Sequence, residues 1–98
     1  MYVVLWRYVV RPGAEAAFEA LHGDNGPWVR LFADYAGWHS TELLREDDAG
    51  RYLTIDRWTS EDAYVAFLAD AGERYADLDA QGDALTLAEE RVGAYRPC

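Results

Sequence analysis

The sequence has a single cysteine, Cys98, which is the last residue, so no disulfide can form within the chain. Free thiols are typical of the reducing cytoplasm, and we expect the protein to be cytoplasmic. No apolar run approaches the roughly 20 residues that a membrane-spanning helix requires, and no secretory leader pattern follows Met1. The sequence therefore predicts neither an internal disulfide nor a membrane partner.

Positive charge is also scarce. Nine Lys and Arg residues stand against 18 Asp and Glu, which gives a net charge of −9. Nucleic-acid binding requires clustered basic side chains that displace counterions, and anionic lipid surfaces attract the same kind of cluster. The sequence contains no metal-ligand spacing, phosphate-binding loop or serine-nucleophile elbow. We therefore expect no nucleic-acid partner and no metal site.

Aromatic residues, in contrast, are abundant. The 98 residues include four Trp, seven Tyr and three Phe, and 51% of the chain is hydrophobic. This length predicts one domain, and each aromatic side chain buries about 150–250 Å² when it enters a core. Few of these rings are expected to remain on the surface.

Alternating apolar residues predict strands, and helical spacing predicts the segments between them. The expected elements are a strand at 2–10, a helix at 14–22 with further helical turns from Pro27, strands at 38–45 and 51–58, a helix from 61 with a break near Gly72, and a strand at 89–96. Such a chain closes as an α+β fold, a four-stranded antiparallel sheet with its helices on one face. Residues 1–98 form a single domain in this interpretation.

The segment 51–67 joins a strand to a helix through a tight corner. Leu53 and Ile55 point to one face of the strand, and the opposite face carries Tyr52, Thr54, Asp56 and Trp58. Hydroxyl residues at 59–60 precede two acidic residues, a pattern typical of a capped helix N-terminus.

The face of the predicted sheet away from the helices is apolar. It carries Val3, Leu5, Val9, Leu53 and Ile55. A soluble monomer rarely exposes such a patch, whereas two sheets packed face to face would cover each other. The sequence therefore predicts a homodimer.

Three segments resemble the antibiotic biosynthesis monooxygenase family. They are the opening VVLWRYVVRPG, the turn Ala36-Gly37 before the second strand, and RYLTIDRWTSEDAY. The resemblance covers nearly the whole chain and implies a ferredoxin-like fold that pairs as a dimeric α+β barrel. It also implies a cleft between sheet and helices, which in this sequence would be lined by Trp6, Tyr8, Trp28, Phe32 and Trp58.

The resemblance implies a small monooxygenase that needs no cofactor and acts on a phenolic or polycyclic aromatic substrate to give a quinone-type product. Such chemistry requires a base that removes a phenolic proton, after which the electron-rich anion reacts with O₂. His39 and Asp56 are the candidate bases. One hairpin register places His39 opposite Trp58, and a register shifted by one residue places Trp38 there.

Two further residues have weaker claims to the cleft. Asn25 lies in a Gly-rich break, where it would either donate a hydrogen bond over the cleft or serve the turn itself. His22 ends the first predicted helix, where a cation suits the helix dipole.

Two alternative functions remain open. Haem-degrading relatives combine an Asn on the first strand with a His on the second helix, whereas this sequence has Trp6 at the first position and no histidine after His39. That departure removes the evident axial ligand for iron. The other alternative is a dimer that binds a ligand without catalysis.

Overall fold

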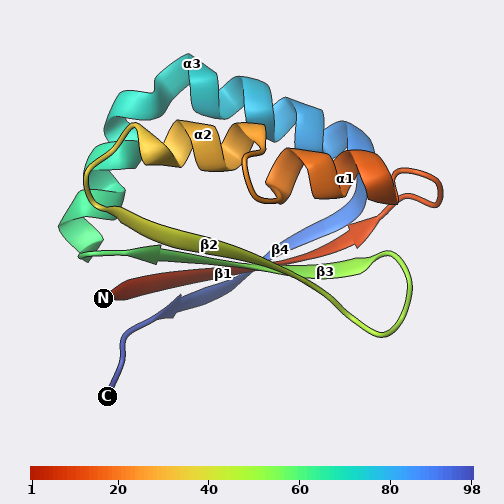
Figure 1. Cartoon of the computed structure of the whole chain (residues 1–98), viewed down its shortest axis with the longest axis horizontal. Helices are drawn as coiled ribbons and strands as arrows, with labels where there is room; N and C mark the ends of the chain where they lie inside the picture. The colour runs from red at the N-terminus through yellow and green to blue at the C-terminus, as the bar shows by residue number, and fades with distance from the viewer.

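The computed structural model describes all 98 residues, and they form one sheet and three helices (Figure 1). In chain order the elements are β1 (Tyr2–Val10), α1 (Glu15–His22), α2 (Pro27–Ala33), β2 (Trp38–Arg45), β3 (Arg51–Trp58), α3 (Glu61–Leu85) and β4 (Thr86–Tyr95). The strand order is β2-β3-β1-β4, and every neighbouring pair is antiparallel. The predicted ferredoxin-like α+β fold is confirmed.

All three helices lie on one face of the sheet (Figure 1). The alternation along β1 explains this arrangement, because Tyr2, Val4, Tyr8 and Val10 are buried beneath the helices. The α1 and α2 helices contribute Phe18, Leu21, Trp28, Leu31 and Phe32 to the same core. None of the three helices combines the length and the apolar character needed to cross a bilayer.

The corner between β3 and α3 has the predicted construction. The Ser60 side chain accepts a 3.1 Å hydrogen bond from the Ala63 backbone N–H and so caps α3, with Glu61 in its first turn. Gly37 lies against this turn, and a Cβ at this position would come within 2.4 Å of the Ala63 Cβ. Any larger residue at 37 would push β2 away from the corner.

The α3 helix is bent at Gly72, where φ is 48° and ψ is −118°. Glycine tolerates this conformation at little cost, so the predicted break is confirmed. The helix then continues to Leu85, and β4 begins at the next residue, three residues before the predicted start at Glu89. That boundary was wrong because no glycine or proline separates the two elements.

The opposite face of the sheet has no helix over it (Figure 1). Its apolar side chains are only partly buried in the single chain, and they are Val3, Leu5, Val9, Leu53 and Ile55. We call these five residues the open face.

Candidate active site

A cavity lies between the sheet and the helices. It is partly open to solvent. Its aromatic walls are Trp6, Trp28, Phe32, Tyr64, Phe67 and Tyr75. Mostly apolar walls with a few polar groups are typical of sites for small organic ligands.

The polar groups at one end of the cavity come from the β2–β3 hairpin. Residues from Ser40 to Arg45 pair with β3 in one register, with Thr41 opposite Asp56. A β-bulge at His39 then shifts the register, so that Trp38 lies opposite Trp58. Bulges often redirect a side chain in this way. His39 itself is exposed, and its Nδ1 lies 3.0 Å from the Ser40 Oγ.

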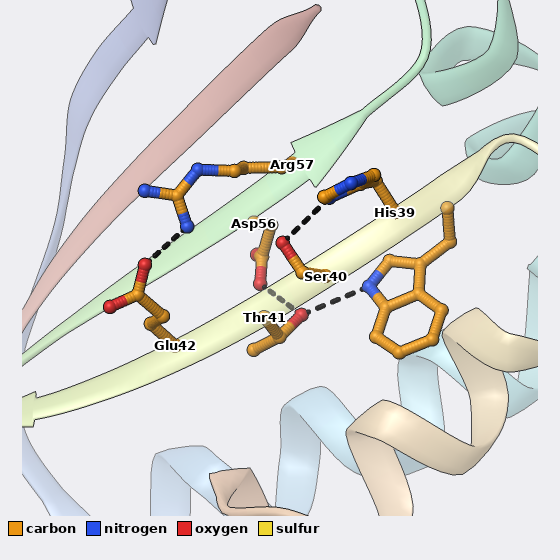
Figure 2. A network of polar contacts seen from close by, with 7 residues as sticks. His39, Ser40, Thr41, Glu42, Asp56 and Arg57 are labelled. Atoms are coloured by element: carbon orange, nitrogen blue, oxygen red, sulfur yellow. Dashed lines mark hydrogen bonds and ion pairs between the residues drawn. The ribbon is translucent and has the colours of Figure 1, made fainter.

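The bulge allows a chain of hydrogen bonds that ends on Asp56 (Figure 2). The Trp38 Nε1–H donates to the Thr41 Oγ1 over 3.1 Å, and the Thr41 hydroxyl donates to the Asp56 Oδ1 over 2.9 Å. Arg57 and Glu42 form a separate ion pair and do not contact Asp56. Asp56 therefore has a neutral donor and no cation beside it.

Burial raises the pKa of the Asp56 carboxyl from its ordinary value to about 6, and the hydrogen bond from Thr41 opposes this rise. A carboxylate with this pKa is ionised at neutral pH, and it is a stronger base than an exposed aspartate. The Asp56 side chain can therefore accept a proton from a ligand in the cavity.

A second polar group lies at the α1 side of the cavity. The Tyr8 and Thr54 hydroxyls are 3.1 Å apart, and the His22 ring lies 5.1 Å from the Tyr8 ring. Burial lowers the pKa of His22 to about 4, so its imidazole is neutral at pH 7. Burial also raises the pKa of the Tyr8 phenol, which stays protonated.

Two carboxylates complete the cavity near the start of β4. Burial raises the pKa of Glu89 to about 6, and the nearby Asp79 and Asp83 carboxylates raise it further. Burial and Asp83 also raise the pKa of Asp79. One oxygen from each of these three carboxylates lies within 4.8 Å of the others.

Five of the eight predicted site residues line the cavity, and they are Trp6, Tyr8, Trp28, Phe32 and Asp56. The other three do not. His39 is turned to the outside by the bulge, and Asn25 is exposed in a turn with φ of 60°. The Asn25 backbone oxygen accepts a hydrogen bond from Arg30, which favours the turn interpretation of this residue.

Trp58 was expected in the wall of the cleft and instead lies behind that wall. It is 0% exposed, and its ring packs against Phe32, Tyr64 and Phe67. These three rings do line the cavity. Trp58 therefore supports the wall without bordering the space, because α2 and α3 close over the corner.

The sequence interpretation missed several lining residues, including Thr41 and Thr54. Alternation correctly placed Thr54 on the inner face of β3 with Asp56, but the residue was not predicted to line the cleft. On α3, Tyr75, Leu78, Asp79 and Gly82 follow the spacing i, i+3, i+4 and i+7. That spacing marks a single helix face, and it could have indicated the second wall.

The fold and the cavity define a class: a ferredoxin-like α+β domain with an aromatic cavity between its sheet and helices and carboxylates among the lining residues. Comparison with known families agrees with this class. The chain belongs to the antibiotic biosynthesis monooxygenase family, whose model matches residues 1–77.

Solved structures share the fold over almost the whole chain. SnoaB from Streptomyces nogalater, described as a cofactor-independent oxygenase, is 29% identical with a TM-score of 0.78, covering 99% of this chain and 92% of that protein. The monooxygenase from the gene ActVA-Orf6 of Streptomyces coelicolor, solved with Nanaomycin D, is 20% identical with a TM-score of 0.81, covering 99% and 87%. Rv0793 from Mycobacterium tuberculosis is 21% identical with a TM-score of 0.74, covering 99% and 94%.

One curated protein matches a segment only. Fifty residues are 38% identical to the arginine–tRNA ligase of Anaeromyxobacter dehalogenans (strain 2CP-C). The match covers 51% of this chain and 8% of that ligase.

Proposed function

We propose that the protein is a monooxygenase that oxidises a phenolic or polycyclic aromatic substrate to a quinone-type product, using O₂ without a metal or flavin. The observation that carries this proposal is Asp56, a carboxylate with a pKa of about 6 at the edge of an aromatic cavity. The description of SnoaB as a cofactor-independent oxygenase supports the same chemistry.

In the proposed mechanism a flat substrate packs between the aromatic walls, and the Asp56 carboxylate accepts its phenolic proton. The resulting anion is rich in electrons and passes an electron to O₂, and a C–O bond then forms at a ring carbon. Loss of the hydrogen on that carbon and cleavage of the O–O bond give the second carbonyl. One oxygen atom enters the product, and the other leaves as water with the proton returned by Asp56.

The binding residues in this proposal are Trp6, Tyr8, Trp28 and Phe32. The Trp28 side chain lines the cavity and its Nε1–H is buried without a hydrogen-bond partner. A buried donor without a partner costs free energy.

A second copy of the chain would cover the open face. Two sheets packed through Val3, Leu5, Val9, Leu53 and Ile55 would bury these side chains and produce the proposed α+β barrel dimer. The cavity lies on the helical side of the sheet, so each subunit keeps a cavity of its own.

The haem-degrading alternative has less support. The α3 helix (61–85) contains no histidine, and the cavity position at 6 on β1 is occupied by tryptophan. A ligand-binding dimer without catalysis is the remaining alternative. It shares the cavity and differs only in whether Asp56 transfers a proton.

The deciding experiment incubates the purified protein with hydroxylated anthracenes and naphthalenes in air and under argon. We expect quinone absorbance in air only, and with ¹⁸O₂ one labelled atom in the product and one in water. Aromatic binding without any turnover across the panel would favour the binding module. Equal turnover under argon would contradict the proposed use of O₂.

A further inference from the structure

The charges in the cavity all have the same sign. Three carboxylates line it, Asp56 from β3, Asp79 from α3 and Glu89 from β4. No arginine is among the lining residues, and the whole chain contains no lysine. The only other ionisable lining groups are phenols and the neutral His22.

The arginines of the chain lie elsewhere. Six of the nine form ion pairs with carboxylates outside the cavity, and these six are Arg7, Arg45, Arg51, Arg57, Arg74 and Arg96. Arg30 donates to a backbone oxygen in the turn before α2. Arg91 is exposed, and it lowers the pKa of the lining residue Tyr64, although burial of that phenol has the larger, opposite effect.

The carboxylates lie toward two ends of the cavity. The β1 strand lies between the strands that carry the two acids. Its residue Val4 pairs with Asp56 of β3, and its residue Tyr8 pairs with Glu89 of β4, so the acids are four residues apart along β1. Four residues span about 13 Å along a strand. Burial raises the pKa values of Tyr8 and Tyr75, and the negative charges of Asp56 and Glu89 raise both values further. Their field therefore acts through the length of the cavity.

The end near Glu89 combines negative charge with aromatic faces. Tyr75 packs edge-to-face on Trp28 with ring centroids 5.0 Å apart, and both rings line the cavity with Asp79. Carboxylates beside aromatic faces attract an ammonium group and repel a carboxylate. The Trp28 Nε1–H is also buried here without a hydrogen-bond partner, in a side chain that is only 7% exposed.

We infer that the cavity selects elongated phenolic aromatics that are uncharged or carry an amine at the end far from the phenol, and rejects those that carry a carboxylate there. The phenol lies at Asp56 and the distal substituent at Asp79 and Glu89. The assignment of the phenol rests on the proposed function, whereas the charge preference is a property of binding and is measured without turnover.

The test uses three matched anthracenols with a hydroxymethyl, an aminomethyl or a carboxylate group on the ring far from the phenol. Binding is measured by isothermal titration calorimetry at pH 8, where the acids are ionised. We expect the aminomethyl compound to bind at least about tenfold more tightly than the carboxylate, with the hydroxymethyl compound between them or equal to the amine. Added salt should narrow the difference.

Two charge-matched double variants separate a local effect from net charge. In the double variant Asp79→Asn/Glu89→Gln, the ratio of the affinity for the aminomethyl compound to that for the carboxylate compound should move severalfold closer to one. Asp47→Asn with Asp48→Asn removes the same charge from the exposed β2–β3 loop and should leave the ratio unchanged. If both double variants change the ratio equally, the preference belongs to the whole molecule and the inference fails.

Arg91→Gln provides the opposite test. If the carboxylate compound binds as tightly as the amine and loses affinity in this variant, Arg91 is an anion site and the inference is wrong. The charge preference without any quinone formation would overturn the proposed function alone. Turnover without a charge preference would overturn this inference alone, and failure of all three compounds to bind would overturn both.

Discussion

The Thr41 hydroxyl donates a 2.9 Å hydrogen bond to the Asp56 carboxylate and accepts a 3.1 Å hydrogen bond from the Trp38 indole N–H. This bond stabilises the ionised carboxylate, so Thr41→Val should raise the pKa of Asp56 above its value of about 6. A base must be ionised to accept a proton, so activity falls as pH drops through this pKa. We expect the acid limb of the kcat profile to move up by roughly one pH unit.

Thr41→Ser keeps the hydroxyl and should restore the wild-type profile. Trp38→Phe removes only the indole donor and should give a smaller shift in the same direction. An unchanged acid limb in Thr41→Val would show that Asp56 is not the group whose ionisation controls the rate.

Asp56→Asn keeps the size of the side chain and removes its basicity. Turnover should fall by roughly 10²–10⁴-fold while KM changes little, because the base acts mainly in the transition state. His39→Gln should retain activity, since the His39 ring is exposed and outside the cavity. Steady-state kinetics on one quinone-forming substrate measure both variants. A large loss in His39→Gln with none in Asp56→Asn would reverse the assignment of the base.

His22 should make stability sensitive to acid. Its folded pKa of about 4 lies below its ordinary value of 6.5, so the unfolded chain binds a proton first as pH falls. The stabilising contribution is complete above pH 6.5 and is lost as pH falls toward 4. Between pH 6.5 and 4, the free energy of unfolding of His22→Phe should therefore fall by about 1–3 kcal/mol less than that of the wild type, as measured by urea unfolding. Parallel curves for the two proteins would show that His22 does not titrate as proposed.

Ile55 lies on the open face, where it pairs with Leu5 of β1, and Ile55→Asp should prevent pairing of two copies. A charge buried in the proposed interface without a partner costs several kcal/mol by rough estimate. Multi-angle light scattering should show a dimer for wild type and monomer or aggregate for the variant. Val65→Asp is the control, because Val65 is 54% exposed on α3 and should not affect assembly. A wild-type monomer at micromolar concentration contradicts the proposed dimer.

Trp58→Ala should destabilise the fold rather than only weaken binding. The side chain is completely buried behind the cavity wall, and a truncation of this kind costs about 3–5 kcal/mol. Trp58→Phe should cost less and leave the cavity rings in place. Thermal unfolding compares the variants. If Trp58→Ala weakened ligand binding without lowering stability, the result would show that Trp58 borders the cavity and contacts the ligand.

The sequence predicted the fold well because period-two alternation and helix caps are local signals. The bounds predicted for β2 and β3, the cap at Ser60 and the break at Gly72 all agree with the structure. The start of β4 could not be read, since the change from helix to strand at Thr86 is set by pairing with Val10. Val10 and Thr86 are far apart in sequence, and no residue near Thr86 indicates that the strand begins there.

The site was only partly predictable. Both hairpin registers that the sequence left open occur in the structure, one on each side of the bulge at His39. No residue type in this segment signals a bulge, so the outward position of His39 could not be foreseen. The hidden position of Trp58 depends on how closely α2 and α3 pack over the corner, which is a tertiary property.

During synthesis on the ribosome, β1 is the first strand to emerge, yet one of its two neighbours, β4, is the last. At roughly 5–20 residues per second, the edge of β1 stays unpaired for about 4–15 s. An apolar strand with a free edge is a template for pairing with another chain. The β1 strand, one of the two central strands of the finished sheet, is therefore the one most open to wrong pairing in the nascent chain, and chaperones that shield exposed strands should act there.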